Sequence, residues 1–349
     1  MTANKSMDET AGPTKMKGVV LYGNRDLRII DLPRPEVGGD GVIIKIRAVG
    51  VCGTDVHTYK TGIFREMSIP IGEEGVLFGH EFAGDVEAVA DGLDVDFAPG
   101  DRVTGFTLGA YAEYAKCDTA ILGVPAVLKL PDHVSYEEAA TVEPLTVSLT
   151  AIRRAQPLPG ERLLIIGAGM IGLGCVQILR ALYPEVEIFI SDISEKRLAM
   201  AKAFGAHHTI DARSTDVVAE MKAVSGEEFV LYNTKGSANI DIVMECAGLE
   251  LTLNQALEAV KPHTGRLVMV ALYEDTPRVD LNQVVSKNID LRGVLHYGLE
   301  DVQEALDLMA DGKVDRKPLI THRFALVDAK EAFEAQINTV DTLKAVILP

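Results

Sequence analysis

The sequence has no tryptophan, and aromatic residues make up only 5% of its 349 positions. A large pocket lined by aromatic side chains is therefore not expected. Cysteine is also scarce: the four cysteines stand far apart, which gives no disulfide framework of the kind that small secreted domains use. The start, Met1–Lys5, lacks the apolar core of a signal peptide. These absences predict a reducing, cytoplasmic setting.

Basic residues are in the minority. There are 34 Lys and Arg against 51 Asp and Glu, which gives a formal net charge of -17 at pH 7, and no basic run offsets it locally. Because such a charge repels phosphate groups, neither nucleic acid nor an anionic membrane surface is expected as a partner. No uninterrupted apolar run reaches the roughly 20 residues that span a bilayer. Solubility explains the acidic excess, with adaptation to salt as the alternative.

The 349 residues are enough for two domains with separate cores. Residues 1–15 carry almost nothing apolar, so they are predicted to form a disordered extension. From Met16 to Ala115, short β-branched runs are bounded by Gly, Asp or Pro, which predicts strands joined by turns. The pattern becomes helical between Tyr136 and Arg154, where Ser135–Glu138 resembles a helix-capping box.

Strands and helices alternate in the second half of the chain. The strand Arg162–Ile166 leads into a glycine turn and an apolar helical run, and the alternation continues to Val294. This order is typical of a doubly wound parallel sheet with helices on both faces. The other strands are predicted at 187–192, 208–210, 241–245, 266–270 and 290–294, and the helices at 195–204, 217–224 and 251–260. The last part is predicted to hold helices 299–309 and 329–335 and strands 319–324 and 345–348.

The glycine turn has the spacing of a dinucleotide-binding fingerprint. Gly167 permits a tight turn, Gly169 lets the backbone approach a pyrophosphate, and Gly172 lets the helix pack closely on the strand. Asp192 ends the second strand, twenty residues after Gly172, where a carboxylate accepts hydrogen bonds from the adenine ribose and repels a 2′-phosphate. The sequence therefore predicts NAD as the cofactor and not NADP, although the nearby Arg197 would favour the phosphate.

Four residues of the first half offer the ligands of a metal site. Cys52, His80, Glu81 and Glu143 supply a thiolate, an imidazole and two carboxylates, all expected on loops between strands. Zinc is the usual occupant of a mixed sulfur, nitrogen and oxygen set. A carboxylate beside a histidine ligand can also orient the ligands from outside the metal, so direct ligation by Glu81 and an indirect role are both open.

Several motifs occur together in one order. They are Val49–His57, Gly79–Gly84, Pro99–Val103, Val142–Leu145, the glycine fingerprint and Lys317–His322. On these motifs the chain resembles the zinc-dependent medium-chain alcohol and polyol dehydrogenases from Met16 to Pro349, and Asp290–Tyr297 is most similar to their sorbitol, butanediol and threonine dehydrogenase branch. The resemblance implies an α/β fold. A Rossmann NAD-binding domain at 156–295 would be inserted in a mainly-β, GroES-like catalytic domain at 16–155 and 296–349, with the active site between them.

The resemblance also implies a role for each candidate ligand. Cys52, His80 and Glu81 would hold one catalytic zinc, with Glu143 either a further ligand or linked to the metal through water. Zinc would act as a Lewis acid that lowers the pKa of an alcohol, so that hydride can pass to NAD. No structural zinc is implied, because the segment Thr104–Tyr111 has no cysteine where the family carries four.

The segment that follows Cys52 contains three further residues with expected roles in the same reaction. The resemblance makes Thr54 the hydrogen-bond partner of the substrate hydroxyl, and Thr54 would pass the proton to solvent together with the cofactor ribose and His57. Asp55 would support the ligands from outside the metal. A hydrogen-bonded loop histidine without a catalytic role is the alternative for His57.

Further positions carry cofactor and substrate roles by resemblance. Lys344 falls where the family often has a basic residue near the cofactor pyrophosphate, and Cys246–Gly248 with Ala271-Leu272 would form the nicotinamide side of the cleft. His296 and Tyr297 occupy a substrate-contact position, with a place in an interface or in the core as the alternative.

The implied function is NAD-linked oxidation of a secondary alcohol, a polyol or sugar alcohol, by a homodimer or homotetramer. Threonine and 2,3-butanediol are alternative substrates. A metal-free quinone or enone reductase and a non-catalytic structural protein are alternatives from other classes. Cys52 with His80-Glu81 argues against the first, and a site with every motif residue in place argues against the second.

Overall fold

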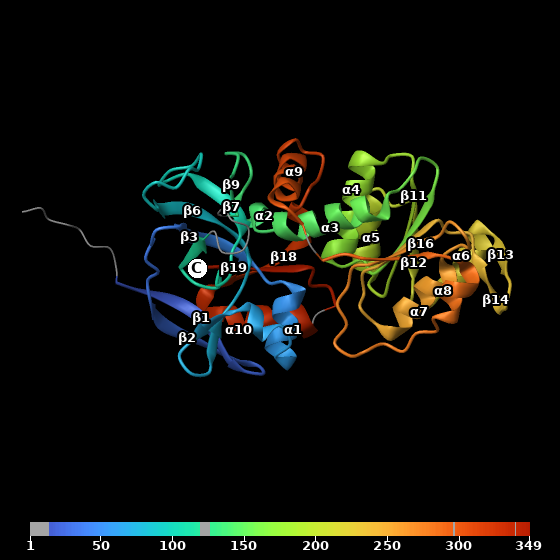
Figure 1. Ribbon diagram of the computed structural model, residues 1–349, viewed down its shortest axis with the longest axis horizontal. Helices are drawn as coiled ribbons and strands as arrows, with labels where there is room; N and C mark the ends of the chain where they lie inside the picture. Colours follow the sequence, from blue (N-terminus) through green and yellow to red (C-terminus); the bar gives the residue numbers. More distant parts are fainter. Residues whose placement is uncertain (1–13, 119–125, 296, 339) are drawn as a thin grey trace, which may run out of the picture.

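Two groups of strands lie at opposite ends of the computed structural model, which describes residues 14–118, 126–295, 297–338 and 340–349. In Figure 1 the helices α3 (Val142–Ala155) and α9 (Leu299–Ala310) lie between the two groups. Most of the predicted extension 1–15 falls outside the described residues, although the first strand already begins at Lys15. No helix of the described part combines the length and the apolar character that a bilayer crossing needs.

Both ends of the chain build the mainly-β domain. Its strands are β1 (Lys15–Gly23), β2 (Asp26–Pro33), β3 (Gly41–Gly50), β4 (Ile69–Ile71), β5 (Gly75–Leu77), β6 (Glu81–Val89), β7 (Arg102–Phe106), β8 (Tyr114–Asp118), β9 (Val127–Lys129), β18 (Ile320–Ala325) and β19 (Lys344–Leu348). A four-stranded sheet has the order β2-β1-β5-β4, and a seven-stranded sheet has the order β18-β19-β3-β6-β7-β9 with β8 paired to β3. Because β19 pairs antiparallel with β3, with Val346 opposite Gly50, the C-terminal segment completes the domain that the N-terminal segment begins.

Short helices accompany these strands. They are α1 (Gly53–Thr61), α2 (Tyr136–Ala139), α10 (Ala329–Asn338) and the 3-10 helices η1 (Arg65–Met67), η2 (Lys317–Leu319) and η3 (Leu326–Asp328). Ser135 caps α2 through the capping box with Glu138 that the sequence predicts. The helix expected from Ala139 to Arg154 starts later, as α3, and Pro144 lies in its first turn, where its missing N–H leaves no helical hydrogen bond unmade.

The second domain contains a six-stranded parallel sheet of order β12-β11-β10-β15-β16-β17. Its strands are β10 (Arg162–Ile166), β11 (Glu187–Asp192), β12 (His208–Asp211), β15 (Ile242–Glu245), β16 (Arg266–Met269) and β17 (Asp290–Gly293), and its helices are α4 (Met170–Leu182), α5 (Glu195–Ala203), α6 (Val217–Ser225), α7 (Glu250–Ala259) and α8 (Asn282–Lys287). The strand order reverses between β10 and β15, the point at which such sheets bind ligands outside their carboxyl ends. The predicted α/β class with a Rossmann sheet is confirmed.

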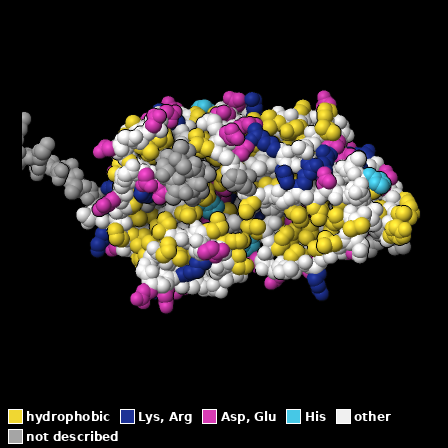
Figure 2. Space-filling view, viewed as in Figure 1, with side chains coloured by type: hydrophobic (Ala, Val, Ile, Leu, Met, Phe, Trp, Pro, Cys, Tyr) yellow, Lys and Arg dark blue, Asp and Glu magenta, His cyan; other side chains and the backbone are white. Residues whose placement is uncertain are grey.

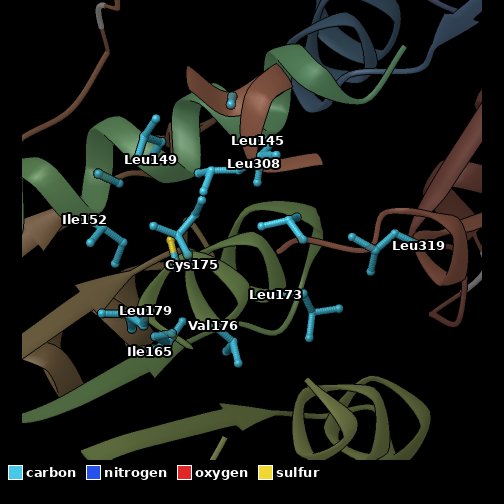
Figure 3. Packing of buried hydrophobic residues seen from close by; sticks show 14 of the residues in the cluster. Leu145, Leu149, Ile152, Ile165, Leu173, Cys175, Val176, Leu179, Leu308 and Leu319 are labelled. Atoms are coloured by element: carbon cyan, nitrogen blue, oxygen red, sulfur yellow. The ribbon is translucent and has the colours of Figure 1, made fainter. Parts of the chain in front are cut away.

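A buried apolar cluster joins the two domains. Figure 3 shows Leu145 and Leu149 of α3 facing Cys175 and Leu179 of α4, with Leu308 of α9 beside them. All of these side chains are buried, so Cys175 serves here as a small apolar residue. The packing holds α3, whose first turn carries Glu143, against the helix that follows the glycine turn.

Three elements differ from the sequence prediction. Thr54 and His57 lie in helix α1 and not on a loop, and Cys52 is the residue at the helix N-cap. The buried residues of α1 are Asp55, Thr58 and Tyr59, so the helix has no apolar stripe that a periodicity search could find. The hairpin of β13 (Glu227–Val230) and β14 (Asn233–Ala238) and the helix α8 were also not expected.

Candidate active site

A thiol, an imidazole and a carboxylate meet at the end of β3. One ligand atom each from Cys52, His80 and Glu81 lies within 4.8 Å of the others. The pairing of β3 with β6 causes this, because Gly50 lies opposite Glu81 and Cys52 follows Gly50 by two residues. Sulfur, nitrogen and oxygen donors at such separations fit a tetrahedral zinc that keeps a position for substrate or water. The three residues are called the donor triad below.

Glu81 is fully buried and is held by Lys344. The Lys344 ammonium donates to both carboxylate oxygens, at 2.9 and 2.7 Å, and to the carbonyl of Val51 at 2.9 Å. Only 3% of the Lys344 side chain is exposed. A buried carboxylate needs such a partner to offset the loss of its hydration. Gly50 provides the space, since a Cβ atom there would overlap Oε2 of Glu81.

The contacts of Lys344 correct its predicted role. An ammonium has three N–H donors, and those of Lys344 are used by Glu81 and the Val51 carbonyl. The side chain belongs to β19 and points to the donor triad because β19 pairs with β3. Lys344 is therefore a partner of the candidate metal site and has no free donor for a cofactor pyrophosphate.

Asp55 and Tyr111 support the imidazole of His80. His80 Nδ1 lies 3.5 Å from Asp55 Oδ1, and the Tyr111 hydroxyl donates to Asp55 Oδ2 at 2.6 Å. Burial and the adjacent Asp55 carboxylate raise the pKa of Tyr111 well above its ordinary value, so the phenol stays a donor. A carboxylate on one ring nitrogen of a histidine leaves the other nitrogen for a metal.

Charge and burial shift the pKa values of Cys52 and His80. Burial raises the pKa of the Cys52 thiol, and the nearby His80 opposes this rise only in part. Burial lowers the pKa of His80, but the charge of Asp55 and its hydrogen bond to the ring outweigh this effect and raise the pKa well above its usual value. Without a cation both groups therefore keep protons near neutral pH, and a metal has to displace them.

Glu143 lies outside the donor triad. Its carboxylate oxygen Oε1 accepts a hydrogen bond from the hydroxyl of Tyr297 at 2.5 Å, and only 8% of Glu143 is exposed. Burial raises the pKa of Glu143, against the effect of His80. Burial and Glu143 raise the pKa of Tyr297. A phenol that follows β17 thus contacts a carboxylate that begins α3, while His296 lies outside the described residues.

Thr54 and His57 lie one turn apart on α1. The Thr54 hydroxyl lies 3.2 Å from the sulfur of Cys52, which places it beside the donor triad. His57 Nδ1 lies 2.8 Å from Oε1 of Glu274, a residue of the loop that follows β16. Lys60 Nζ donates to the same oxygen at 2.6 Å. These contacts join the two domains next to the candidate metal site.

The glycine turn has the geometry that a dinucleotide needs. Gly167 has a φ of +105°, which favours glycine. A Cβ atom at Gly172 would overlap the carbonyl of Gly167, so glycine is required for the close packing of α4. A Cβ atom at Gly169 would meet nothing within 4 Å, so this side of the turn is open, and α4 begins there without a side-chain cap. Its free N–H groups can receive a phosphate.

Asp192 and Arg197 lie next to this turn. Asp192 Oδ2 accepts from the N–H of Ala168 at 2.7 Å, which ties the end of β11 to the glycine turn. The Arg197 guanidinium donates to the carbonyl of Thr342 at 2.9 Å and so contacts the mainly-β domain. Within the described residues its buried Nε has no hydrogen-bond partner.

Comparison with known proteins decides the family. Residues 38–132 match the family model described as alcohol dehydrogenase GroES-like domain, and residues 171–311 match the one described as zinc-binding dehydrogenase. Sorbitol dehydrogenase from Bacillus subtilis (strain 168) is 31% identical, over 97% of this chain and 98% of that protein. The chain belongs to the zinc-binding dehydrogenases. The predicted family and the predicted oxidoreductase class are thereby confirmed.

Solved structures agree with this fold. The 2R,3R-butanediol dehydrogenase from Bacillus subtilis has a TM-score of 0.80 and 27% identity, over 96% of this chain and 99% of that chain. Galactitol-1-phosphate dehydrogenase from Escherichia coli has a TM-score of 0.79 and 26% identity, over 96% of this chain and 100% of that chain.

The sequence prediction does not give three residues around the site of this dehydrogenase the roles that the structure shows. Tyr111, Lys344 and Glu274 hold Asp55, Glu81 and His57, but Tyr111 was assigned to a strand, Lys344 to the cofactor, and Glu274 to nothing. A buried lysine is costly without an acidic partner, so the Lys that begins the otherwise apolar strand Lys344–Leu348 is a signal for one. Glu274 lies in a polar loop, where an acidic residue carries no information.

Proposed function

We propose that this dehydrogenase oxidises a secondary alcohol of a polyol or sugar alcohol and transfers the hydride to NAD, with zinc held by the donor triad. The observation that carries the proposal is the meeting of Cys52, His80 and Glu81 within 4.8 Å in a chain whose second domain has an open glycine turn. The names of the similar enzymes support the substrate class, since one is a sorbitol dehydrogenase and another a galactitol-1-phosphate dehydrogenase.

The donor triad would hold the metal with Glu81 as its third protein ligand. When bound, zinc supplies Lewis acidity that lowers the pKa of an alcohol hydroxyl. Lys344 fixes the orientation of the Glu81 carboxylate, and Asp55 fixes that of the His80 ring. Glu143, bonded to Tyr297 and outside the triad, would hold a water or a substrate hydroxyl instead of the metal.

The proton of the alcohol would leave through α1. Thr54, beside the sulfur of Cys52, is in place to hydrogen-bond the substrate hydroxyl. His57 lies one turn further along the helix with 24% of its side chain exposed, so it can exchange a proton with solvent. With the cofactor ribose between them, these two residues would form a route from the reacting hydroxyl to water.

NAD is the proposed cofactor because of Asp192. A carboxylate at the end of the second strand accepts from a ribose diol and repels a 2′-phosphate. Arg197, the cation that would favour NADP, donates to the Thr342 carbonyl. Turnover with NAD should exceed turnover with NADP at equal concentration, and the reverse preference would contradict this assignment.

The test of the function is a screen of NAD-linked oxidation over polyols, sugar alcohols, diols and 3-hydroxy amino acids. Zinc content is measured on the same preparations. Cys52→Ala should lose both zinc and activity, whereas Cys117→Ala removes a buried thiol of β8 that does not belong to the donor triad and should keep both. Full activity without zinc would overturn the proposal. Preferential oxidation of 2,3-butanediol would select the alternative that the structural similarity to butanediol dehydrogenase supports.

We also infer that two copies associate through β17. Among the described strands β17 ends the parallel sheet, and an unpaired strand edge is a template for pairing with another copy. Leu291, Val285 and Leu295 near this edge are 39%, 80% and 78% exposed, and Figure 2 shows apolar side chains gathered on this half of the molecule. Light scattering should give a dimer or tetramer that Leu291→Lys dissociates and Met67→Lys, on the other domain, leaves intact. A monomeric wild-type protein would overturn this.

The cytoplasmic setting also stays a proposal. Each of the four cysteines is a free thiol in the structure, as expected in a reducing compartment. Cell fractionation with a thiol-labelling reagent is the test, and recovery with oxidised cysteines outside the cytoplasm would contradict it.

A further inference from the structure

Glu274 belongs to the cofactor domain but contacts two side chains of the catalytic domain. It follows β16 by five residues, in the loop that also holds Ala271 and Leu272. Its Oε1 lies 2.8 Å from His57 Nδ1 and 2.6 Å from Lys60 Nζ. Both partners lie on α1, the helix that begins at Cys52. The carboxylate therefore connects the loop of one domain to the helix of the other.

The contact determines which nitrogen of His57 carries the proton. An ionised carboxylate can only accept, so Nδ1 of a neutral His57 must donate to it, and Nε2 is left with a free lone pair. Lys60 keeps the carboxylate ionised: the hydrogen bonds from Lys60 and then His57 hold the pKa of Glu274 below its usual range. The ring of Phe64 lies nearly perpendicular to the imidazole, at an interplanar angle of 75° and with 6.5 Å between the ring centroids.

We propose that Glu274 is a positioning residue that fixes the ring orientation and the tautomer of His57 for proton transfer. The proposal rests on the proposed function, in which His57 carries the proton of the alcohol. With Nδ1–H committed to Glu274, Nε2 is the nitrogen left to accept the proton. When Nε2 accepts it, the imidazolium donates at both nitrogens, and the proton leaves from Nε2 to water.

The exposure of Glu274 separates this role from a stabilising one. The exposed fractions of the side chains are 35% for Glu274, 29% for Lys60 and 24% for His57. Ion pairs with such exposure contribute about 0–1 kcal/mol to folding. Loss of the carboxylate should therefore leave the fold intact and act on catalysis. Because the carboxylate comes from the cofactor domain, the imidazole is positioned only when the two domains have the relative placement seen here.

The test is a double-mutant cycle on the zinc-loaded full-length enzyme, with Glu274→Ala, His57→Asn and both together. Glu274→Ala is expected to lower kcat/KM for alcohol oxidation on the order of tenfold, as loss of a partner behind a functional histidine does. In the His57→Asn background the same change should cost nothing more. Asp275→Asn, which removes a neighbouring loop charge, should stay within about twofold of wild type. If the losses of kcat/KM in the two single variants multiply in the double variant, the two residues act independently and the proposal is overturned.

A second readout needs no turnover. Nitrogen-15 NMR of the histidine side chains, with His57 assigned by its absence in His57→Asn, reports which ring nitrogen is protonated. The wild type should show the Nδ1–H form, and Glu274→Ala should shift His57 toward Nε2–H. Glu274→Gln keeps an acceptor oxygen and should restore Nδ1–H. If the tautomer follows Glu274 but no alcohol is oxidised, the proposed function fails and the positioning stands. An unchanged tautomer in Glu274→Ala refutes the positioning alone.

Discussion

Lys344 and Glu81 form an ion pair with exposed fractions of only 3% and 0%, so removal of the lysine charge should act on both folding and metal binding. Lys344→Met keeps the length of the side chain but removes the ammonium that donates to both oxygens of the buried Glu81 carboxylate. Breaking a buried pair in this way costs about 3–5 kcal/mol, against about 0–1 kcal/mol for a surface pair. In the metal-free protein we expect a loss of about 3–5 kcal/mol in the free energy of unfolding.

Zinc should reduce this loss if Glu81 is a ligand. The metal then provides the positive charge that Lys344 supplied, and the loss measured by urea unfolding of the zinc-loaded variant should be smaller. Linkage requires that each 1.4 kcal/mol of the difference appear as roughly tenfold tighter zinc binding in Lys344→Met than in wild type. Chelator competition measures this second quantity independently.

Two controls make the reasoning refutable. The double variant Glu81→Gln/Lys344→Met replaces both charges and should recover most of the metal-free stability, because exchange of both partners costs far less than loss of one. Lys344→Arg keeps the charge and should stay close to wild type without metal. An equal loss with and without zinc would show that Glu81 does not bind the metal. A loss below about 1 kcal/mol would refute the assigned cost of the buried pair.

Further predictions concern the same site and the glycine turn. Gly50→Ala places a methyl group against Glu81 Oε2, so the zinc content after dialysis, measured by elemental analysis, should fall. Gly53→Ala is the control, because a Cβ atom there meets nothing within 4 Å, and this variant should retain its zinc. Zinc affinity should rise with pH, because burial raises the pKa of Cys52 and the metal needs the thiolate. The expected rise is about tenfold per pH unit for each proton that the metal displaces. A zinc affinity that does not change with pH in chelator competition would contradict this. Gly172→Ala overlaps the Gly167 carbonyl and should abolish NADH binding, measured by fluorescence titration; unchanged binding would contradict the close packing.

The parts of the fold that the sequence could predict are those with a local cause. The predicted strands 162–166 and 187–192 coincide with β10 and β11, because strands buried on both faces are continuous apolar runs. The glycine turn was recognisable because its steric demands fall on single residues: Gly172 has no room for a side chain. The same holds for Ser135 and Glu138, whose capping box closes within one turn.

Helix α1 shows why a local pattern can fail. Its buried side chains are Asp55, Thr58 and Tyr59. Asp55 and Tyr59 have distant hydrogen-bond partners, whereas Thr58 donates to the nearby carbonyls of Thr54 and Ile63. Asp55 receives the hydroxyl of Tyr111, and Tyr59 donates to Glu334 at 2.6 Å. A helix stabilised by such hydrogen bonds has no 3.6-residue hydrophobic period, so the sequence indicates a loop there. Tertiary contacts determine the helix that carries the candidate relay.

The site also contains residues that the sequence could predict and residues that it could not. Cys52, His80 and Glu81 come from neighbouring strands of one domain, and their motifs could be found in the sequence. The groups that hold His57 and Glu143 come from 217 and 154 residues away, at Glu274 and Tyr297, and no sequence period connects such pairs. Both of these partners follow strands at the far edge of the parallel sheet, β16 and β17, on the cofactor side. The metal donors can therefore form within the catalytic domain alone, whereas the arrangement of the proton-handling groups depends on how the two domains pack.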